Sequence, residues 1–190
     1  MNSTASLETG GSLRLFLALL LPPDATEAVV RWSDQHLERG RRPESLHITL
    51  AFLGPRPETE LEAIIGALKE SAAGARPFTL ALASYRETRS VGMLVLDDPT
   101  GAATRLAGAL QSRLEEIGSY RRERRPWLPH VTVLRFRERP RLSPSIAPLQ
   151  AELGSFAPSE AAAFLSRLHP RNSAGGARYE VLETCRLNSS

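Results

Sequence analysis

The sequence predicts an α+β fold of two similar lobes, each with a mostly antiparallel sheet, with helices on the outside and a cleft in the middle. Along the chain, apolar runs typical of strands alternate with segments whose apolar residues recur every three to four positions, as in helices. One short pattern also occurs twice, as His47-Ile48-Thr49 and His130-Val131-Thr132, each time in an apolar run between two helical segments. The repeat predicts two lobes about a pseudo-two-fold axis, with the two His-x-Thr strands central.

The first elements are a buried strand and a helix. Leu13–Leu20 is a nearly continuous apolar run, typical of a strand that is buried on both faces. After Pro22-Pro23, the spacing of Asp24 and Glu27 is that of a capping box, which predicts a helix to about residue 38.

The first His-x-Thr run predicts a strand over residues 46–52, which Gly54-Pro55 should break. Thr59 and Glu62 repeat the capping-box spacing ahead of a segment with its apolar residues on one helical face. We therefore expect a helix there that packs on a sheet.

The second half of the chain predicts a hairpin and further helices and strands. Residues 160–168 are ambiguous, because three alanines favour a helix while the alternation of 161, 163 and 165 with 162, 164 and 166 favours a strand. The other predicted elements are hairpin strands over 77–85 and 91–96, a helix over 100–117 that Gly118 stops, a strand over 130–136, a helix over 146–153 and a strand over 179–187.

No linker separates the two His-x-Thr runs, so residues 13–187 are expected to form a single bilobal domain with closely packed lobes. Residues 1–12 are rich in Ser, Thr and Gly and are expected to be a flexible N-terminal tail.

Composition limits the function classes. Of the 190 residues, 42% are apolar and 24% charged, which is ordinary for a globular protein. The net charge of +3 suits an anionic substrate, although the use of arginine almost throughout, with Lys69 the only lysine, equally fits genome composition. The single cysteine, Cys185, excludes an intramolecular disulfide and a multi-cysteine zinc site and fits a cytoplasmic protein. The apolar stretch Leu13–Leu21 is too short to span a bilayer.

The repeated pattern carries the chemistry. Side chains two positions apart in a strand share a face, so each histidine lies on the same face as its threonine. Two such strands side by side would bring together two imidazoles that exchange protons near neutral pH and two hydroxyls that donate hydrogen bonds to an anion. The pattern therefore favours a reaction centre.

These residues resemble the 2H phosphoesterase superfamily, whose signature is two His-x-Thr/Ser motifs followed by apolar residues. Within it they are most similar to the RNA 2′,3′-cyclic phosphodiesterases, also known as 2′–5′ RNA ligases. The segments that carry the resemblance are Arg14–Ala18 with Leu21-Pro22, Ser45–Gly54, Pro126–Arg135, and Arg167-Leu168 with Gly176–Tyr179. Two such motifs with these flanks are a specific signal, and the resemblance covers roughly residues 13–187.

The resemblance implies the bilobal 2H phosphoesterase fold and hydrolysis of RNA or nucleoside 2′,3′-cyclic phosphates to 2′-phosphomonoesters, without a metal or any other cofactor. By the family's assignment, His130 is the base that activates water and His47 the acid that protonates the departing 3′ oxygen. Thr49 and Thr132 would hold the non-bridging oxygens. Arg135 matches a family arginine that contacts phosphate. Strand alternation puts it on the face opposite to His130, so a bulge or the end of the strand must turn it inward.

Three features that flank the motifs are further candidates for contact with the substrate. Phe52, at the end of the first motif, and Trp127, where the family often has Phe, are candidates for contact with the substrate. The run Arg121–Arg125 is either a solvated loop or a rim that draws in a phosphodiester, and the sequence leaves both open.

The protein is expected to be a monomer that acts on RNA ends or cyclic nucleotides. The main alternative is a non-catalytic RNA-end-binding protein that uses the same cleft and the Arg121–Arg125 rim. A reversible 2′–5′ RNA ligase or an enzyme for another cyclic phosphoester would use the same four side chains. A two-histidine metal site is disfavoured, because neither motif contains an Asp or Glu to complete it.

Overall fold

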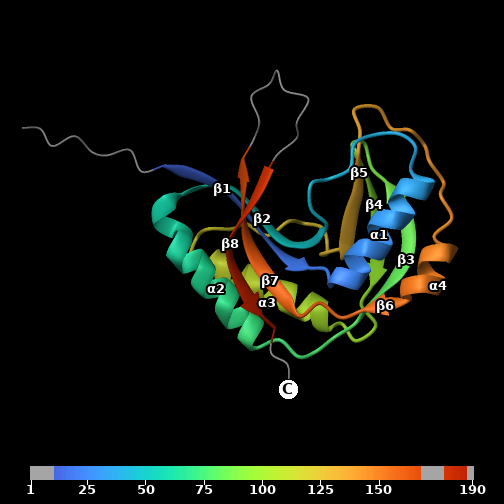
Figure 1. Cartoon of the computed structure of the whole chain (residues 1–190). Coiled ribbons are helices and arrows are strands. Elements are labelled where there is room, and N and C mark those ends of the chain that lie inside the picture. The colour runs from blue at the N-terminus through green and yellow to red at the C-terminus, as the bar shows by residue number, and fades with distance from the viewer. Residues whose placement is uncertain (1–10, 168–177, 188–190) are drawn as a thin grey trace, which may run out of the picture.

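The computed structural model describes residues 11–167 and 178–187. In this part of the chain the strands form two four-stranded antiparallel sheets, with the strand orders β2-β1-β7-β8 and β5-β4-β3-β6 (Figure 1). The first sheet consists of β1 (Ser12–Leu20), β2 (His47–Pro57), β7 (Glu160–Arg167) and β8 (Arg178–Arg186). The second consists of β3 (Leu80–Glu87), β4 (Val91–Asp97), β5 (His130–Arg135) and β6 (Ser155–Phe156). The prediction of an α+β fold with antiparallel sheets is confirmed.

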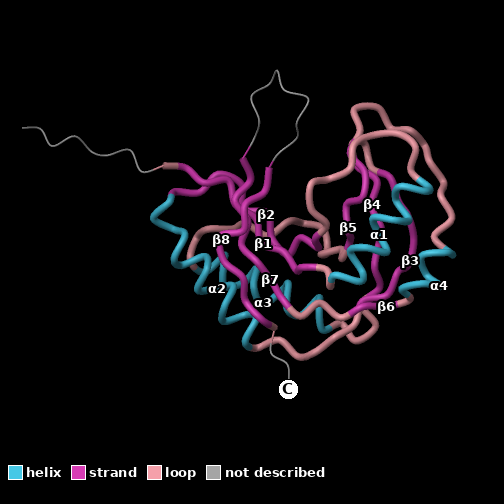
Figure 2. The backbone as a smooth tube through the Cα atoms, viewed as in Figure 1, coloured by secondary structure: helices cyan, strands magenta, loops and turns pink. Residues whose placement is uncertain are grey.

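Each sheet is covered by helices, and each lobe receives one of its helices from the connection between two strands of the other. The helices are α1 (Pro23–His36), α2 (Leu61–Ala73), α3 (Ala102–Glu116) and α4 (Ala147–Leu153), with a short 3₁₀ helix at Glu58–Glu60. Although α1 connects β1 to β2, it lies with α4 over the second sheet (Figure 2). There Trp32 of α1 contacts Tyr85 of β3. Likewise α3 connects β4 to β5 but packs with α2 on the first sheet. The exchange ties the two lobes together.

The expected pseudo-two-fold relation follows from this order, because β1-α1-β2-α2 corresponds to β4-α3-β5-α4. The lobes are not consecutive halves of the chain, however. The first sheet combines strands from both ends of the sequence, and the second uses the middle. β2 and β5 are edge strands of their own sheets rather than central ones, and these two edges contact each other in the middle of the molecule (Figure 1).

The ambiguity over residues 160–168 is resolved in favour of a strand. β7 is hydrogen-bonded to β1 on one side and to β8 on the other, and its residues from Ala161 to Ser166 are all buried. The alanines fit here because a strand in the middle of a sheet has little room on either face. Tertiary packing thus overrides the helical propensity of the segment.

Several expectations about element ends were wrong. Gly54-Pro55 does not break β2, because the strand absorbs an irregularity there, with Gly54 at φ 68, and continues to Pro57. Pro57 pairs with Ser12, so Ser12 belongs to β1 and not to a tail, whereas residues 1–10 lie outside the described residues. Neither predicted capping box forms, since no side chain caps the N-terminus of α1 or α2. The hairpin, α3, α4 and the last strand lie close to where they were predicted.

Among the described residues, no helix combines the length and the apolar character needed to cross a membrane.

Candidate active site

Each of the two His-x-Thr strands has a β-bulge directly after its threonine. In β2, Thr49 pairs with Ala18 and Ala51 with Leu17, so Leu50 is the extra residue. In β5, Thr132 pairs with Met93 and Leu134 with Gly92, so Val133 is the extra residue. A bulge inserts one residue and reverses the alternation of the side chains beyond it. The position five residues after each histidine therefore turns to the same side as the histidine.

Those two positions hold Phe52 in β2 and Arg135 in β5. The bulge predicted for Arg135 is present, and its guanidinium reaches across the lobes, where Nη2 donates a hydrogen bond to the Tyr179 hydroxyl of β8 at 3.2 Å. Phe52 is 48% exposed and lies under the guanidinium of Arg14, 4.9 Å from it.

His47 lies over aromatic side chains on the cleft face of the first sheet. Its ring centroid is 4.9 Å from that of Phe16, 5.7 Å from Phe164 and 5.6 Å from Tyr179, which meets it edge-on. The pKa of His47 is lowered from its ordinary value of 6.5 to about 4, and burial is the largest cause. The positive charges of Arg135 and, more weakly, His130 contribute to this lowering, and a backbone hydrogen bond with Ser45 opposes it. His47 is therefore neutral at pH 7 in the absence of a ligand.

His130 lies on the opposite wall, and its ring is fixed by the backbone. Its Nδ1 is 2.8 Å from the carbonyl oxygen of Leu128. Since a carbonyl only accepts hydrogen bonds, Nδ1 carries the proton in the neutral ring and Nε2 is left to act as a base. Trp127 joins the two walls, because its Nε1 donates a hydrogen bond to the carbonyl oxygen of Thr49 at 2.9 Å.

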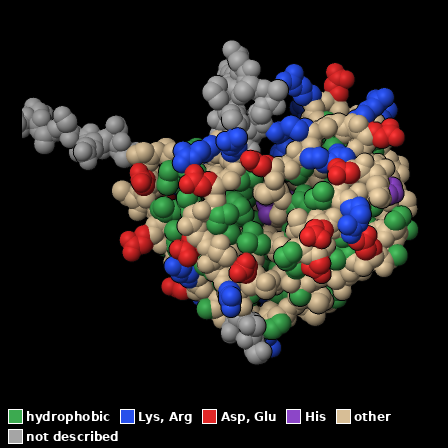
Figure 3. Space-filling view, viewed as in Figure 1, with side chains coloured by type: hydrophobic (Ala, Val, Ile, Leu, Met, Phe, Trp, Pro, Cys, Tyr) green, Lys and Arg blue, Asp and Glu red, His purple; other side chains and the backbone are tan. Residues whose placement is uncertain are grey.

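Two adjoining cavities run along these walls. The first, of about 230 Å³, is lined by His47 and Arg135, and the second, of about 280 Å³, by His130 and Trp127. Thr49 and Phe52 line both. Thr132 lines neither, although it is half-buried on β5 just before the bulge. In the space-filling view a histidine is visible in the hollow between the lobes, below a rim where Lys and Arg side chains gather (Figure 3).

Sequence reasoning missed the aromatic residues under His47. Phe164 had a usable signal, because residues 162, 164 and 166 form one of the two alternating sets and become the cleft face of β7. Phe16 had none, because the apolar run of β1 hides which face each residue takes. Tyr179 had none, because no local pattern shows that β8, at the end of the chain, joins the first sheet. Among the residues that the structure describes, no group of three or more His, Cys, Asp or Glu side chains is placed to hold a metal ion.

The run Arg121–Arg125 was interpreted either as a solvated loop or as a rim that draws in a phosphodiester, and its members differ in this respect. Arg122 is held against α3, where Nη2 donates hydrogen bonds to the Gly108 carbonyl and the Ser112 hydroxyl, and it forms an ion pair with Glu115. Arg125 instead lines the cavity that contains His130.

Comparison with known proteins identifies the family. A sequence model described as the 2′–5′ RNA ligase superfamily matches residues 21–169. The chain belongs to this superfamily. The resemblance to 2H phosphoesterases inferred from the two His-x-Thr motifs is confirmed.

Two groups of relatives support the assignment. The RNA 2′,3′-cyclic phosphodiesterase of Escherichia coli (strain K12) is 33% identical over 132 residues, which are 64% of this chain and 71% of that protein. The structure of Escherichia coli LigT complexed with 3′-AMP has a TM-score of 0.76 and 26% identity, and the match covers 94% of this chain and 100% of that one. TT0787 of Thermus thermophilus has a TM-score of 0.73 and 29% identity, over 92% and 98%. The fold of this superfamily member is thus LigT-like, and a cyclic phosphoesterase activity follows from the relationship.

Proposed function

We propose that the protein hydrolyses the cyclic phosphodiester of RNA or nucleoside 2′,3′-cyclic phosphates to a 2′-phosphomonoester, with two histidines as acid and base and no metal ion. The observation that carries this proposal is the placement of His47 and His130 on facing strand edges, each on the cleft side of its sheet. An in-line displacement needs a proton acceptor on one side of the phosphorus and a proton donor on the other. The two adjoining cavities, one with each histidine, offer those two sides.

In the proposed reaction, Nε2 of His130 takes a proton from a water molecule as its oxygen attacks phosphorus. The P–O3′ bond breaks, and His47 gives its proton to the departing 3′ oxygen, so that the phosphate stays on O2′. Thr49, which lines both cavities, would donate a hydrogen bond to a non-bridging oxygen. For Thr132 the same role remains a prediction from the motif.

The low pKa of His47 requires the substrate to assist. A neutral His47 has no proton to give, yet two of the causes that lower its pKa are the positive charges of Arg135 and His130. A bound phosphodiester anion beside Arg135 would offset those charges and raise the pKa of His47. His47 would thus gain its proton mainly in the complex, where it is needed.

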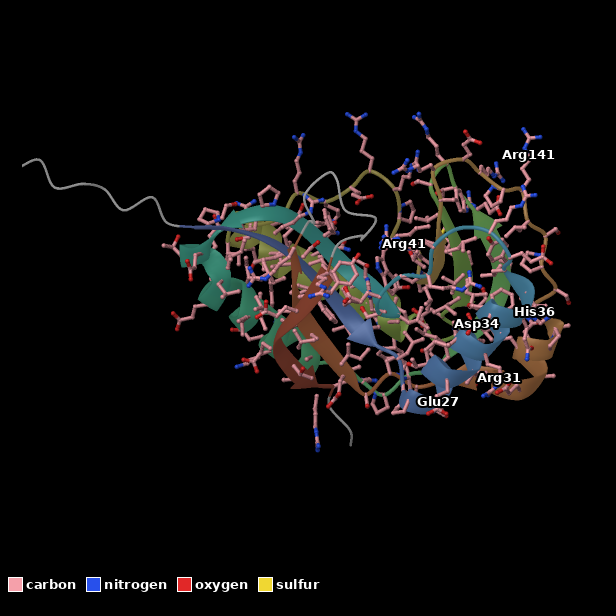
Figure 4. All side chains as sticks on the ribbon, turned by 45° about the horizontal axis from the view of Figure 1, so that its top comes forward. Glu27, Arg31, Asp34, His36, Arg41 and Arg141 are labelled. Carbon is pink, nitrogen blue, oxygen red and sulfur yellow. The ribbon has the colours of Figure 1, made fainter. Side chains whose placement is uncertain are left out.

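Product analysis and histidine variants test the proposal. The expected product of a nucleoside 2′,3′-cyclic phosphate is the 2′-phosphomonoester alone, distinguished from the 3′ isomer by ³¹P NMR, with activity that survives a chelator. His47→Gln and His130→Gln should each lower turnover by about 10²–10⁴-fold. His36→Gln is the matched control, because His36 lies at the outer end of α1, where its Nδ1 is bonded to the Trp32 carbonyl (Figure 4). Binding without turnover would favour the non-catalytic RNA-end-binding protein instead.

One observation favours 2′–5′ RNA ligation as a second candidate. The cavity beside His130, of about 280 Å³, is far larger than one water molecule needs. Since His130 activates the attacking oxygen, that space could admit a nucleoside hydroxyl in place of water. Formation of a 2′–5′ linkage from a cyclic-ended and a 5′-hydroxyl RNA would support it.

A further inference from the structure

The loop between α1 and β2 pairs with the free edge of β5 at one point. Arg41 and Arg135 exchange two backbone hydrogen bonds, each 2.8 Å from nitrogen to oxygen. Residues that pair in this way in an antiparallel bridge send their side chains to the same face. Arg135 faces the cleft, where it contacts Tyr179 and lines the cavity with His47. Arg41 therefore also emerges on the cleft side, and Figure 4 shows it between the two lobes.

The pairing depends on a glycine. Gly40 has φ +96, and a Cβ at this position would lie 2.8 Å from the Arg135 carbonyl oxygen and 3.0 Å from the Leu134 side chain. Only a residue without a side chain lets the loop approach β5 this closely. The position of Arg41 next to Arg135 is thus built into the fold.

The charges of this pair are not balanced within the described residues. Neither Arg41 nor Arg135 forms an ion pair there, and the one side-chain hydrogen bond of Arg135 goes to the neutral Tyr179 hydroxyl. The next residue, Arg42, differs, because its guanidinium is bonded to the Ser33 and Leu37 carbonyls and to the Asp34 carboxylate. Like charges directly across a bridge repel each other. An anion that lies between the two guanidinium groups would turn this repulsion into attraction.

We propose that Arg41, next to Arg135, binds a second phosphate of the substrate, the 5′-phosphate of the nucleoside whose 2′,3′-cyclic phosphate is cleaved. Arg135 lines the cavity of His47, and Arg41 lies one strand spacing from it, about 5.5 Å between Cα atoms, outside the residues that line this cavity. With the reacting phosphate at the histidines, the next phosphate along the nucleotide is the anion that reaches the outer arginine. This role for Arg41 rests on the proposed function. If Arg41 has this role, the preferred substrate is the 3′-terminal nucleotide of an RNA rather than a cyclic nucleoside phosphate without a 5′-phosphate.

A binding comparison tests this role without depending on turnover. Adenosine 2′,5′-bisphosphate and adenosine 2′-monophosphate differ only in the 5′-phosphate, and calorimetry gives the ratio of their affinities. We expect the wild type to prefer the bisphosphate by about tenfold, as for one charge-assisted hydrogen bond at an exposed site. Arg41→Gln should remove most of this preference, and Arg41→Lys should keep part of it. Arg39→Gln is the matched control, since it removes an exposed arginine of the same loop that lies outside the pair.

Equal affinities in the wild type, a preference that survives in Arg41→Gln, or an equal loss in Arg39→Gln would each overturn the role of Arg41. The same ratio measured as kcat/KM, on adenosine 2′,3′-cyclic phosphate with and without a 5′-phosphate, connects the site to catalysis. If neither compound is hydrolysed, the proposed function fails, while the calorimetric ratio still decides whether Arg41 binds the second phosphate.

Discussion

The proton affinity of His47 is the property of this site that a single charge should change most clearly. The shift of its pKa from 6.5 to about 4 disfavours the protonated ring by about 3 kcal/mol. Burial over Phe16 and Phe164 is the largest cause, and the Arg135 cation is the next. Arg135→Met keeps much of the aliphatic bulk and removes the charge. We expect it to raise the pKa of His47 above 4 while leaving it below 6.5, because burial persists.

The assay is an NMR titration of the imidazole signals, with the His47 resonance identified by its loss in His47→Gln. Inorganic phosphate added to the wild type should raise the pKa of His47 as well, since the anion offsets Arg135. In Arg135→Met the same addition should have a smaller effect, because part of the binding site is gone. The acid limb of kcat/KM, which reports the free protein, should lie near pH 4 in the wild type and move upward in the variant.

Two results would refute this reasoning. A His47 resonance that titrates near 6.5 in the free wild type would mean that the ring is not buried over the aromatic residues. An unchanged pKa in Arg135→Met would mean that the guanidinium does not act on His47, and that the bulge in β5 has no electrostatic consequence.

Two further predictions concern stability and the contact between the cleft walls. Trp127→Phe removes the indole donor to the Thr49 carbonyl and should lower both the free energy of unfolding, by about 1 kcal/mol in urea, and kcat/KM. Trp32→Phe removes a similar bond to the Ser145 carbonyl, away from the cleft, and should lower the stability alone; equal effects on kcat/KM would contradict this. Because the pKa of His47 is lower in the folded state than in the unfolded chain, the wild type should lose up to about 3 kcal/mol as the pH falls from 6.5 to 4. In His47→Gln the loss over that range should be smaller, which denaturant titrations at both pH values would measure.

Local patterns were enough to predict most elements and both motif strands. The periodicity of α3 and the alternation around His47 and His130 depend only on neighbouring residues, and the structure has these elements near their expected positions. The helix or strand state of residues 160–167 could not be decided in this way. It is set by β1 and β8, which are far away in sequence and pair with both edges of the segment.

The arrangement of the candidate site could be predicted from the sequence only in part. The sequence required something to turn Arg135 inward, but the position of the bulge is set by the pairing of β5 with β4, which no single-strand pattern reveals. Likewise, the contact of His47 with Tyr179 needs the first sheet to recruit a strand from the end of the chain. Residues 1–10 of the predicted tail and the whole segment between β7 and β8, residues 168–177, lie outside the described residues.

The pseudo-two-fold symmetry poses a problem that the matched bulges resolve. Two histidines in equivalent strands with equivalent surroundings would have equal affinities for a proton, and neither would be suited to act as acid while the other acts as base. The bulges bring the fifth residue after each histidine to the cleft, and these residues differ in charge. Arg135 lies beside His47 of the other lobe, whereas the matched residue, Phe52, lines the cavities of both histidines. The matched position thus supplies a cation to the His47 side and an uncharged ring to the His130 side, where Arg125 comes from a separate loop. Because the cation can be neutralised by a phosphodiester, the difference between the two sides depends on whether substrate is bound, which is the condition that the proposed proton transfers require.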